Sequence, residues 1–220
     1  MIILLLSKNY SSQFSGNLLL KLLATTIFIL VFLSNSVSAQ SFKGGINLGL
    51  VGSQVAGDRF SGFNKAGITG GPWVSLRTAV HTEFSMELNY IQKGSRENPD
   101  YENNRIDSYI MRLGYIELPI LYRMIYSEKL NFEAGPAMDF LLHHYERFNS
   151  EELNGVDFAK SNLCLILGLS YNFNEKLRVN LRTNNSIFSI RKERVDGDVW
   201  RFFEHGQYND ALIFALYYTL

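Results

Sequence analysis

The last twelve residues of the chain, 209–220, carry a large apolar side chain at every second position. These side chains are Leu212, Phe214, Leu216, Tyr218 and Leu220. Because successive side chains of a β-strand point to opposite faces, this spacing predicts a strand with one apolar face. An amphipathic strand at the end of the chain is typical of a closing strand in a membrane β-barrel, so we expect it to pair with the first strand.

The same period of two recurs along the chain after about residue 40. It is regular in 46–50, 84–90, 116–124, 132–142, 163–173 and 177–181, and less regular around 68–77. With the last strand this makes eight strands, and no segment after residue 40 shows a helical period. We therefore expect a single all-β domain over residues 40–220.

The connections between these strands alternate between long and short. The expected long connections are 53–64, 94–108, 146–160 and 191–208, and the short ones are 78–81, 127–129 and 174–176. Bacterial outer-membrane barrels have an even number of strands, short periplasmic turns and longer extracellular loops. The pattern predicts an eight-stranded antiparallel up-and-down transmembrane β-barrel with both ends of the chain in the periplasm.

A soluble barrel of the lipocalin kind is the alternative, and it would turn its apolar side chains inward around a ligand. Strands of about ten to fifteen residues favour the membrane form, since roughly 9 to 11 tilted residues cross a bilayer. Aromatic residues near the expected strand ends favour it too, because such rings suit a membrane interface. These are Trp73, Tyr90, Tyr122, Tyr126, Tyr171, Phe173, Tyr217 and Tyr218.

The polar face of the strands must then line the inside of the barrel. In an eight-stranded barrel, side chains largely fill the lumen, so a wide pore is not expected. Buried charges need partners, and we expect a structural charge network in the lumen. Its expected members are Glu87, Glu117, Arg123, Glu133, Asp139, Arg178 and Arg182.

The N-terminus predicts export. Lys21 precedes an apolar run of about a dozen residues, 22–33, and the small-residue segment after it ends at Ala39. This is the pattern of a secretory signal peptide with cleavage after residue 39. The 21 basic and 21 acidic residues balance, so no basic surface indicates nucleic-acid binding.

Pro119 lies inside an expected strand, where a missing N–H predicts a local irregularity. The surrounding run 115–122, Tyr-Ile-Glu-Leu-Pro-Ile-Leu-Tyr, resembles the signature of the PorT-like outer-membrane β-barrel family of Bacteroidetes. The segments 42–49, 87–94 and 135–136 look like parts of its first, third and fifth strands. The resemblance implies an outer-membrane barrel and, through the family's namesake, an accessory role in type IX protein secretion.

The cysteine and the histidines, the residues that could support catalysis, do not form a recognisable catalytic motif. Cys164 lies among leucines and isoleucine, which favours strand packing over a reactive thiol. His143, His144 and His205 have no serine at a motif spacing, although His144 and Glu146 could share a face. We expect no catalytic, cofactor-binding or metal-binding residues, and a lipid-modifying enzyme remains the third reading.

The sequence therefore favours a non-enzymatic integral protein of the outer membrane. It would be structural or would bind an extracellular or envelope protein through its outer loops, above all 94–108 and 191–208. Its other expected partners are outer-membrane lipid and, through the closing strand, the barrel-assembly machinery.

Overall fold

A computed structural model describes residues 42–60, 62–99, 101–103, 106–149, 151–153, 157–191 and 199–220. The predicted signal peptide, residues 1–39, lies outside these ranges. The described part of the chain is almost entirely β-structure, with one short 3-10 helix, η1 (Tyr101–Asn103). None of its helices is long and apolar enough to cross a membrane.

Nine long or medium strands form one antiparallel sheet. They are β1 (Phe42–Ala56), β2 (Lys65–Ala79), β3 (Thr82–Glu87), β4 (Asn89–Glu97), β5 (Tyr109–Ile125), β6 (Leu130–Phe148), β8 (Ser161–Asn172), β9 (Leu177–Ser186) and β12 (Tyr208–Thr219). The two-residue β7 (Glu151–Glu152) adds to the end of β6, and β10 (Val199–Arg201) pairs with β11 (Glu204–Gly206) in a separate hairpin.

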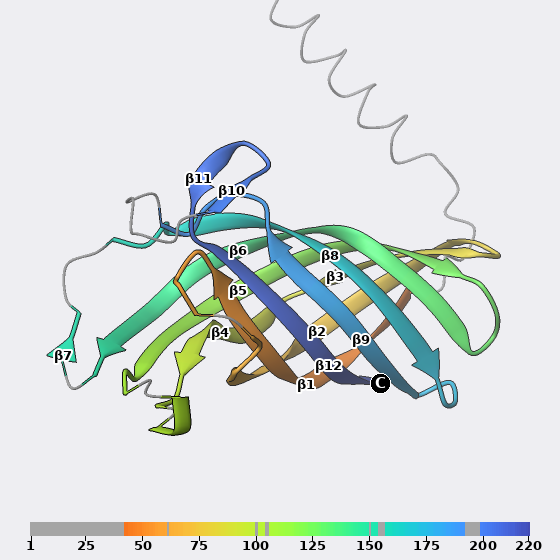
Figure 1. Cartoon of the computed structure of the whole chain (residues 1–220). Coiled ribbons are helices and arrows are strands. Elements are labelled where there is room, and N and C mark those ends of the chain that lie inside the picture. The colour runs from red at the N-terminus through yellow and green to blue at the C-terminus, as the bar shows by residue number, and fades with distance from the viewer. Residues whose placement is uncertain are drawn as a thin grey trace, which may run out of the picture. The chain divides into compact units, whose positions relative to one another are not determined.

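The sheet closes on itself. β3 and β4 follow each other in one strand position, because both lie between β2 and β5. From there the pairing continues through β5, β6, β8, β9 and β12, and β12 pairs with β1. The result is an antiparallel ring of eight strand positions, and the tilted strands of this ring are visible in Figure 1.

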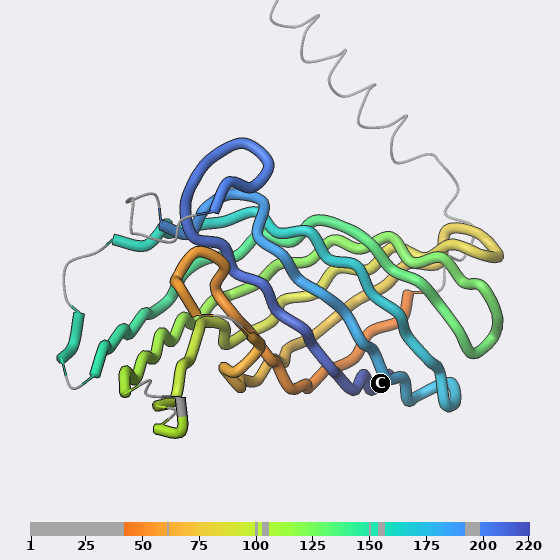
Figure 2. The backbone as a smooth tube through the Cα atoms, viewed as in Figure 1, coloured from red at the N-terminus to blue at the C-terminus, as the bar shows by residue number. Residues whose placement is uncertain are grey.

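The first and last strands meet along almost their whole length. Twelve residue pairs join β1 to β12, from Gly45 opposite Thr219 to Ala56 opposite Tyr208. Figure 2 shows the two segments running side by side, β1 in orange and β12 in dark blue. The Leu220 N–H also donates to the Gly44 carbonyl oxygen, at 3.0 Å. This ladder leaves no open sheet edge at the place where the ring closes.

The two faces of the ring differ in chemistry. Phe214 and Leu165 are 54% and 39% exposed on the outer face, whereas Glu133 and Arg182 are 4% and 1% exposed inside. The closing-strand residues Leu212, Phe214, Leu216, Tyr218 and Leu220 are all exposed on the outer face. A soluble carrier needs the opposite arrangement, so the lipocalin-like alternative is wrong.

Two of the aromatic residues expected at the membrane interface lie elsewhere. Trp73 and Tyr217 are 3% and 1% exposed and face the inside of the ring. Their positions share the inward face with Ser75 and Ala215, so the alternation of the strands decides their direction. Tyr122, Tyr126, Tyr171, Phe173 and Tyr218 are exposed on the outer surface.

The ladder is interrupted at Pro119, as predicted. On one side, β5 pairs with β3 up to Met86 opposite Ile120, and pairing resumes with β4 at Asn89 opposite Glu117. The missing N–H of proline therefore faces the break between β3 and β4. A bulge in the β5–β6 ladder lies several residues away, between Gly114 and Tyr115.

Three of the four long connections start later than the sequence predicted, and the fourth starts earlier because β9 ends at Ser186. β1, β4 and β6 continue to Ala56, Glu97 and Phe148, beyond the expected ends near residues 52, 93 and 145. Polar residues in these extensions had been assigned to loops, but strands can continue past an apolar band into water. The short turns after β2, β5 and β8 lie at one end of the ring, the short-turn end, and the long connections at the other, the loop end (Figure 1).

Substitutions at two glycines of β1 can test how closely the first and last strands approach. A Cβ on Gly45 would lie 1.8 Å from the Tyr218 carbonyl oxygen, whereas one on Gly52 would have its nearest neighbours at 3.7 Å. We expect Gly45→Ala to lower the free energy of unfolding by about 1–3 kcal/mol, because backbone must shift. Gly52→Ala is the matched control, and urea titration of the refolded proteins in detergent, followed by gel mobility, measures both. Equal midpoints would contradict this reading of the closure.

Candidate functional site

The inside of the ring contains layers of charged side chains. In the layer nearest the short-turn end, Arg123 of β5 donates from Nε and Nη2 to Glu133 Oε2 of β6, at 3.3 and 3.2 Å. Arg123 also pairs with Glu83 of β3. Asn180 donates to the other Glu133 oxygen at 2.7 Å. Four strand positions are therefore joined by polar contacts in this layer.

The next layer is centred on Glu87 of β3. Arg182 of β9 donates from Nη1 and Nη2 to Glu87 Oε2, at 3.1 and 3.0 Å. The hydroxyl of Tyr217 donates to the same carboxylate at 3.0 Å, and Asn89 donates to it at 2.8 Å. Because these residues come from β3, β4, β9 and β12, the layer links strands on opposite sides of the ring.

A third layer is organised by Lys93 of β4, which the sequence analysis missed. Its ammonium donates to Asp139 Oδ2 at 2.7 Å and to Asn184 Oδ1 at 2.9 Å, and lies 3.3 Å from Glu117 Oε2. Asn184 donates in turn to Glu117. Lys93 stands an even number of positions after Glu87, so the alternation alone would have placed it on the inward face.

Arg178 is the expected network member that lacks an ion pair within the described residues. Its guanidinium carbon lies 4.5 Å from the centre of the Tyr217 ring and 5.0 Å from that of Trp73. Its Nε and Nη2 atoms are buried and have no hydrogen-bond acceptor. The sequence correctly indicated an inward side chain, but the alternation of a strand does not reveal which partner it meets.

Toward the loop end, the lumen is filled mainly by apolar side chains. This was not predicted, because the sequence analysis assigned the apolar residues to the outer face. The buried cluster consists of Val51, Val55, Ile91, Tyr109, Met111, Leu113, Tyr115, Phe158, Ile190, Ala211 and Ile213, and it continues through Ala215 to Trp73 and Tyr217 beside the charged layers nearer the short-turn end. Charged layers and this cluster together occupy the interior with side chains.

A further ion pair closes the lumen at the loop end. Arg191 pairs with Glu146 of β6, and the Tyr109 hydroxyl donates to Glu146 Oε1 at 2.5 Å. The Arg191 guanidinium also lies over the Phe158 ring, with its carbon 4.1 Å from the ring centre. The pair therefore joins the start of β5 and the end of β6 to the segment before β10.

Asp58 lies beside this closure, in the connection between β1 and β2. Its side chain accepts a hydrogen bond from the Phe60 N–H at 2.9 Å, and the residue is 6% exposed. Burial raises the pKa of Asp58 to about 6, and repulsion by the Glu146 carboxylate acts in the same direction. Ionisation of Asp58 therefore costs free energy in the folded state.

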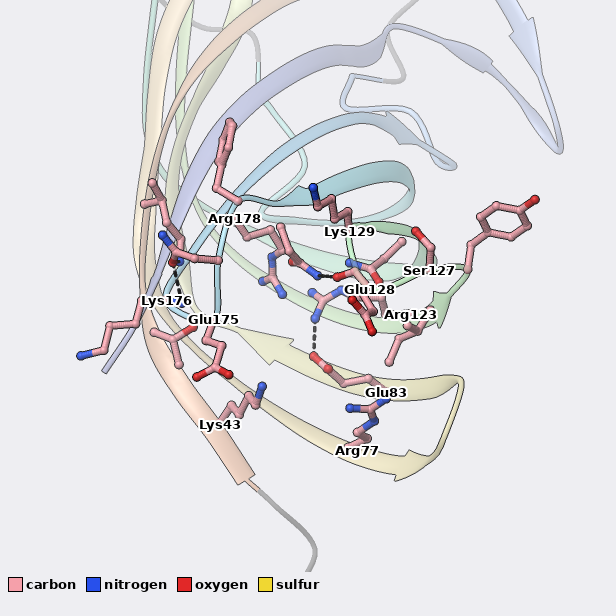
Figure 3. A pocket seen from close by; sticks show the side chains of 18 of the residues that line it. Lys43, Arg77, Glu83, Arg123, Ser127, Glu128, Lys129, Glu175, Lys176 and Arg178 are labelled. Atoms are coloured by element: carbon pink, nitrogen blue, oxygen red, sulfur yellow. Dashed lines mark hydrogen bonds and ion pairs between the residues drawn. The ribbon is translucent and has the colours of Figure 1, made fainter.

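A cavity of about 810 Å³ opens at the short-turn end (Figure 3). Its cationic lining residues are Lys43, Arg77, Arg123, Lys129, Lys176 and Arg178, and its acidic ones are Glu83, Glu128 and Glu175. Arg123 and Arg178 both project into this space in Figure 3, and Glu83 is joined to Arg123 by the dashed line. The mouth therefore combines an excess of cations with a wall formed partly by Trp73.

The loop end carries a different surface, the β10–β11 hairpin. Trp200, Phe202 and Phe203 are 52%, 57% and 73% exposed. Arg201 of this hairpin binds Asp210 of β12 through two contacts, at 2.6 and 2.8 Å. The Tyr208 hydroxyl donates to the Glu204 carbonyl oxygen at 2.5 Å. These bonds tie an aromatic surface to the wall of the ring.

The histidines and the cysteine occupy separate places. Nε2 of His143 lies 3.1 Å from the Tyr90 hydroxyl, the His144 ring packs against Phe158 and the His205 ring lies near Trp200. His81 lines the cavity at the short-turn end. Cys164 is fully buried, and its thiol donates to Asp139 at 3.2 Å.

Comparison with known proteins identifies the fold. Residues 35–191 match the family described as "Outer membrane protein beta-barrel domain". The chain belongs to this family. The protein is therefore located in the outer membrane. Its closed ring with an apolar outer face agrees with that location.

Two solved structures of low sequence identity are similar to this chain. Neisserial surface protein A (NspA) has a TM-score of 0.52 at 9% identity, with 82% of this chain and 100% of that one covered. Ail, the attachment invasion locus protein of Yersinia pestis, solved with the heparin analogue sucrose octasulfate, has a TM-score of 0.47 at 10% identity, covering 82% and 99%. No curated protein matches the sequence.

The lumen layers predict a large cost for removing one charge. Arg182→Met leaves Glu87 buried without its cation, so we expect the free energy of unfolding to fall by roughly 3–5 kcal/mol. Arg147→Met, at an exposed position of β6, is the control and is expected to change little. Urea unfolding in detergent compares the two. The double variant Glu87→Gln, Arg182→Met is expected to recover part of the loss, and no recovery would contradict a charge-pair origin.

Asp58 predicts a pH dependence of stability. Its pKa is higher in the folded than in the unfolded protein, so the folded protein holds the extra proton between about pH 4 and 6. This residue's contribution to stability therefore falls as the pH rises through that window, by up to about 3 kcal/mol. Asp58→Asn is expected to raise the unfolding midpoint at pH 7.5 and to leave it almost unchanged at pH 4. A gain of equal size at both pH values would contradict the assignment.

Proposed function

We propose that this outer-membrane barrel is a non-enzymatic integral protein that binds an extracellular partner through its loop end. In this arrangement the short turns lie in the periplasm and the long connections outside, as in bacterial outer-membrane barrels generally. The strands cross the bilayer with their apolar face toward lipid. Residues 1–39 would direct export and be removed, and β12 would be the strand that the barrel-assembly machinery recognises.

The observation that carries the proposal is the fixed aromatic surface of the β10–β11 hairpin. Large aromatic side chains supply much of the binding energy at protein interfaces, but exposing them to water is unfavourable. Here Trp200, Phe202 and Phe203 are exposed on a hairpin held by the Arg201–Asp210 pair. A preorganised surface loses less conformational entropy on binding, which suits recognition of a protein partner.

Further contacts restrain the base of the hairpin. The side chain of Glu204 accepts hydrogen bonds from the backbone N–H and the hydroxyl of Ser189, at 2.8 and 2.9 Å. Phe203 also lies against Phe188, with 6.1 Å between ring centres. The segment before β10 and the hairpin are thus attached to one another, and the exposed rings extend over both.

The filled lumen supports a function at the ends of the barrel rather than conduction through it. The charged layers around Arg123, Glu87 and Lys93 and the apolar cluster above them occupy the interior. Their role in this proposal is structural, because each charge stabilises the closed ring through partners on other strands. An accessory role in protein secretion, implied by the resemblance to the PorT-like family, is the specific form of partner binding to test first.

Replacement of the exposed rings tests the proposal. The variant Trp200→Ser, Phe202→Ser, Phe203→Ser is expected to fold, because these side chains are outside the lumen, but to lose partner binding. A deletion strain carrying this variant is expected to show the same changes in secreted and surface proteins as the deletion itself. The matched control, Tyr122→Ser with Tyr126→Ser, removes exposed rings of β5 and the turn after it, near the short-turn end.

Two measurements distinguish loss of function from loss of folding. Quantitative comparison of secreted and surface proteins detects the functional loss, and heat-dependent gel mobility verifies that each variant is folded. Site-specific photo-crosslinking from position 203 on intact cells is expected to give a discrete adduct that position 126 does not give. Full complementation by the triple variant would contradict the proposed role of the hairpin.

A further inference from the structure

We propose that the cavity at the short-turn end is a binding site for a small organic anion whose carboxylate or phosphate group is anchored by Arg178. The site lies at the opposite end from the aromatic hairpin, and its occupancy is independent of the extracellular role. The ligand would reach this site from the periplasm, and only that part of the proposal rests on the orientation given under the proposed function.

The first argument is the unsatisfied guanidinium of Arg178. Its Nε and Nη2 groups are donors without an acceptor among the described residues, although both are shielded from solvent. Leaving such donors unpaired in the interior costs free energy. The rings of Tyr217 and Trp73 hold the guanidinium by cation–π contact, at 4.5 and 5.0 Å from the ring centres. They supply no oxygen acceptor, so the donors remain available for a ligand that reaches them.

The second argument is that the two carboxylates whose charge acts on Arg178, those of Glu133 and Glu83, are already paired with other cations. Glu133 accepts from Arg123 and Asn180 and lies 3.9 Å from Arg182, and Glu83 pairs with Arg123. Arg123 also repels Arg178 electrostatically. An anion seated between these two guanidinium groups would replace repulsion by attraction, and Figure 3 shows both side chains directed into the same space.

The third argument is the shape and chemistry of the cavity. A volume of about 810 Å³ falls in the range of small-molecule sites. Lys43, Lys129 and Lys176 stand around the opening, where they would attract an anion, and Trp73, Ile125 and Phe173 offer apolar wall. The combination fits a ligand with an oxyanion group and a short organic body. Arginine binds carboxylate and phosphate through paired N–H groups, so both groups satisfy the same donors.

Calorimetric titration of the refolded barrel in a nonionic maltoside detergent tests the proposal. The probes are glutarate and inorganic phosphate, added at constant ionic strength so that a general salt effect is excluded. We expect saturable binding of at least one probe and a tenfold or larger loss of affinity in Arg178→Gln. Arg178→Lys keeps the charge without the planar donor group, so a smaller but clear loss is expected. Lys160→Gln, an exposed change at the loop end, is the matched control.

Fluorescence locates the bound anion. The sequence has two tryptophans, Trp73 and Trp200, so Trp200→Phe leaves Trp73 as the single reporter in the cavity wall. Its emission is expected to change with the same saturation curve as the calorimetric signal. Binding of glutarate without phosphate identifies a carboxylate site, and the reverse identifies a phosphate site.

Three outcomes would overturn the proposal. They are the absence of saturable binding of either probe to the unaltered barrel, equal affinity in Arg178→Gln, and saturation without a response from Trp73. Gel mobility before and after heating establishes that each variant is folded. If Arg178→Gln does not fold, Arg178→Lys and the unaltered barrel still decide the question.

Discussion

Closure of the β1–β12 ladder is the constraint on which the rest of this barrel depends. In hydrocarbon, an unpaired backbone N–H or C=O costs several kcal/mol, so the sheet is stable there only if its first and last strands pair. Closing the ring after eight strand positions leaves a narrow interior. Every inward side chain must then find its partners among the others, because neither lipid nor a wide water column is available to them.

The lumen meets this requirement in two ways. Near the short-turn end, Arg123, Arg182 and Lys93 each lie against carboxylates supplied by other strands, so each charge also ties strand to strand. Near the loop end, the apolar cluster removes the need for polar partners. Since a filled interior cannot carry a solute through the bilayer, the chemistry open to binding lies at the two mouths.

The alternation of side chains explains what could be predicted from the sequence. It was sufficient for the number of strands, their antiparallel order, the outer face and the inward direction of Glu87, Glu133 and Arg182. Strand parity also specifies the inward direction of Lys93 and Trp73, although the aromatic ring of Trp73 favours a place at the membrane interface. Partner choice is different, since contacts such as that between Arg182 and Glu87 join residues 95 positions apart in the sequence and depend on the curvature and register of the closed ring.

Arg178 and Arg182 show that the position of an arginine along the lumen determines how its charge is neutralised. They are four positions apart on β9 and point to the same face, but Arg182 reaches the Glu87 carboxylate while Arg178 meets two aromatic rings at the mouth. Deep in the lumen, a cation must be neutralised by the protein itself because no other source of charge is available. At the mouth, a cation can be neutralised from outside, which is the physical basis for proposing a ligand at the unpaired Arg178.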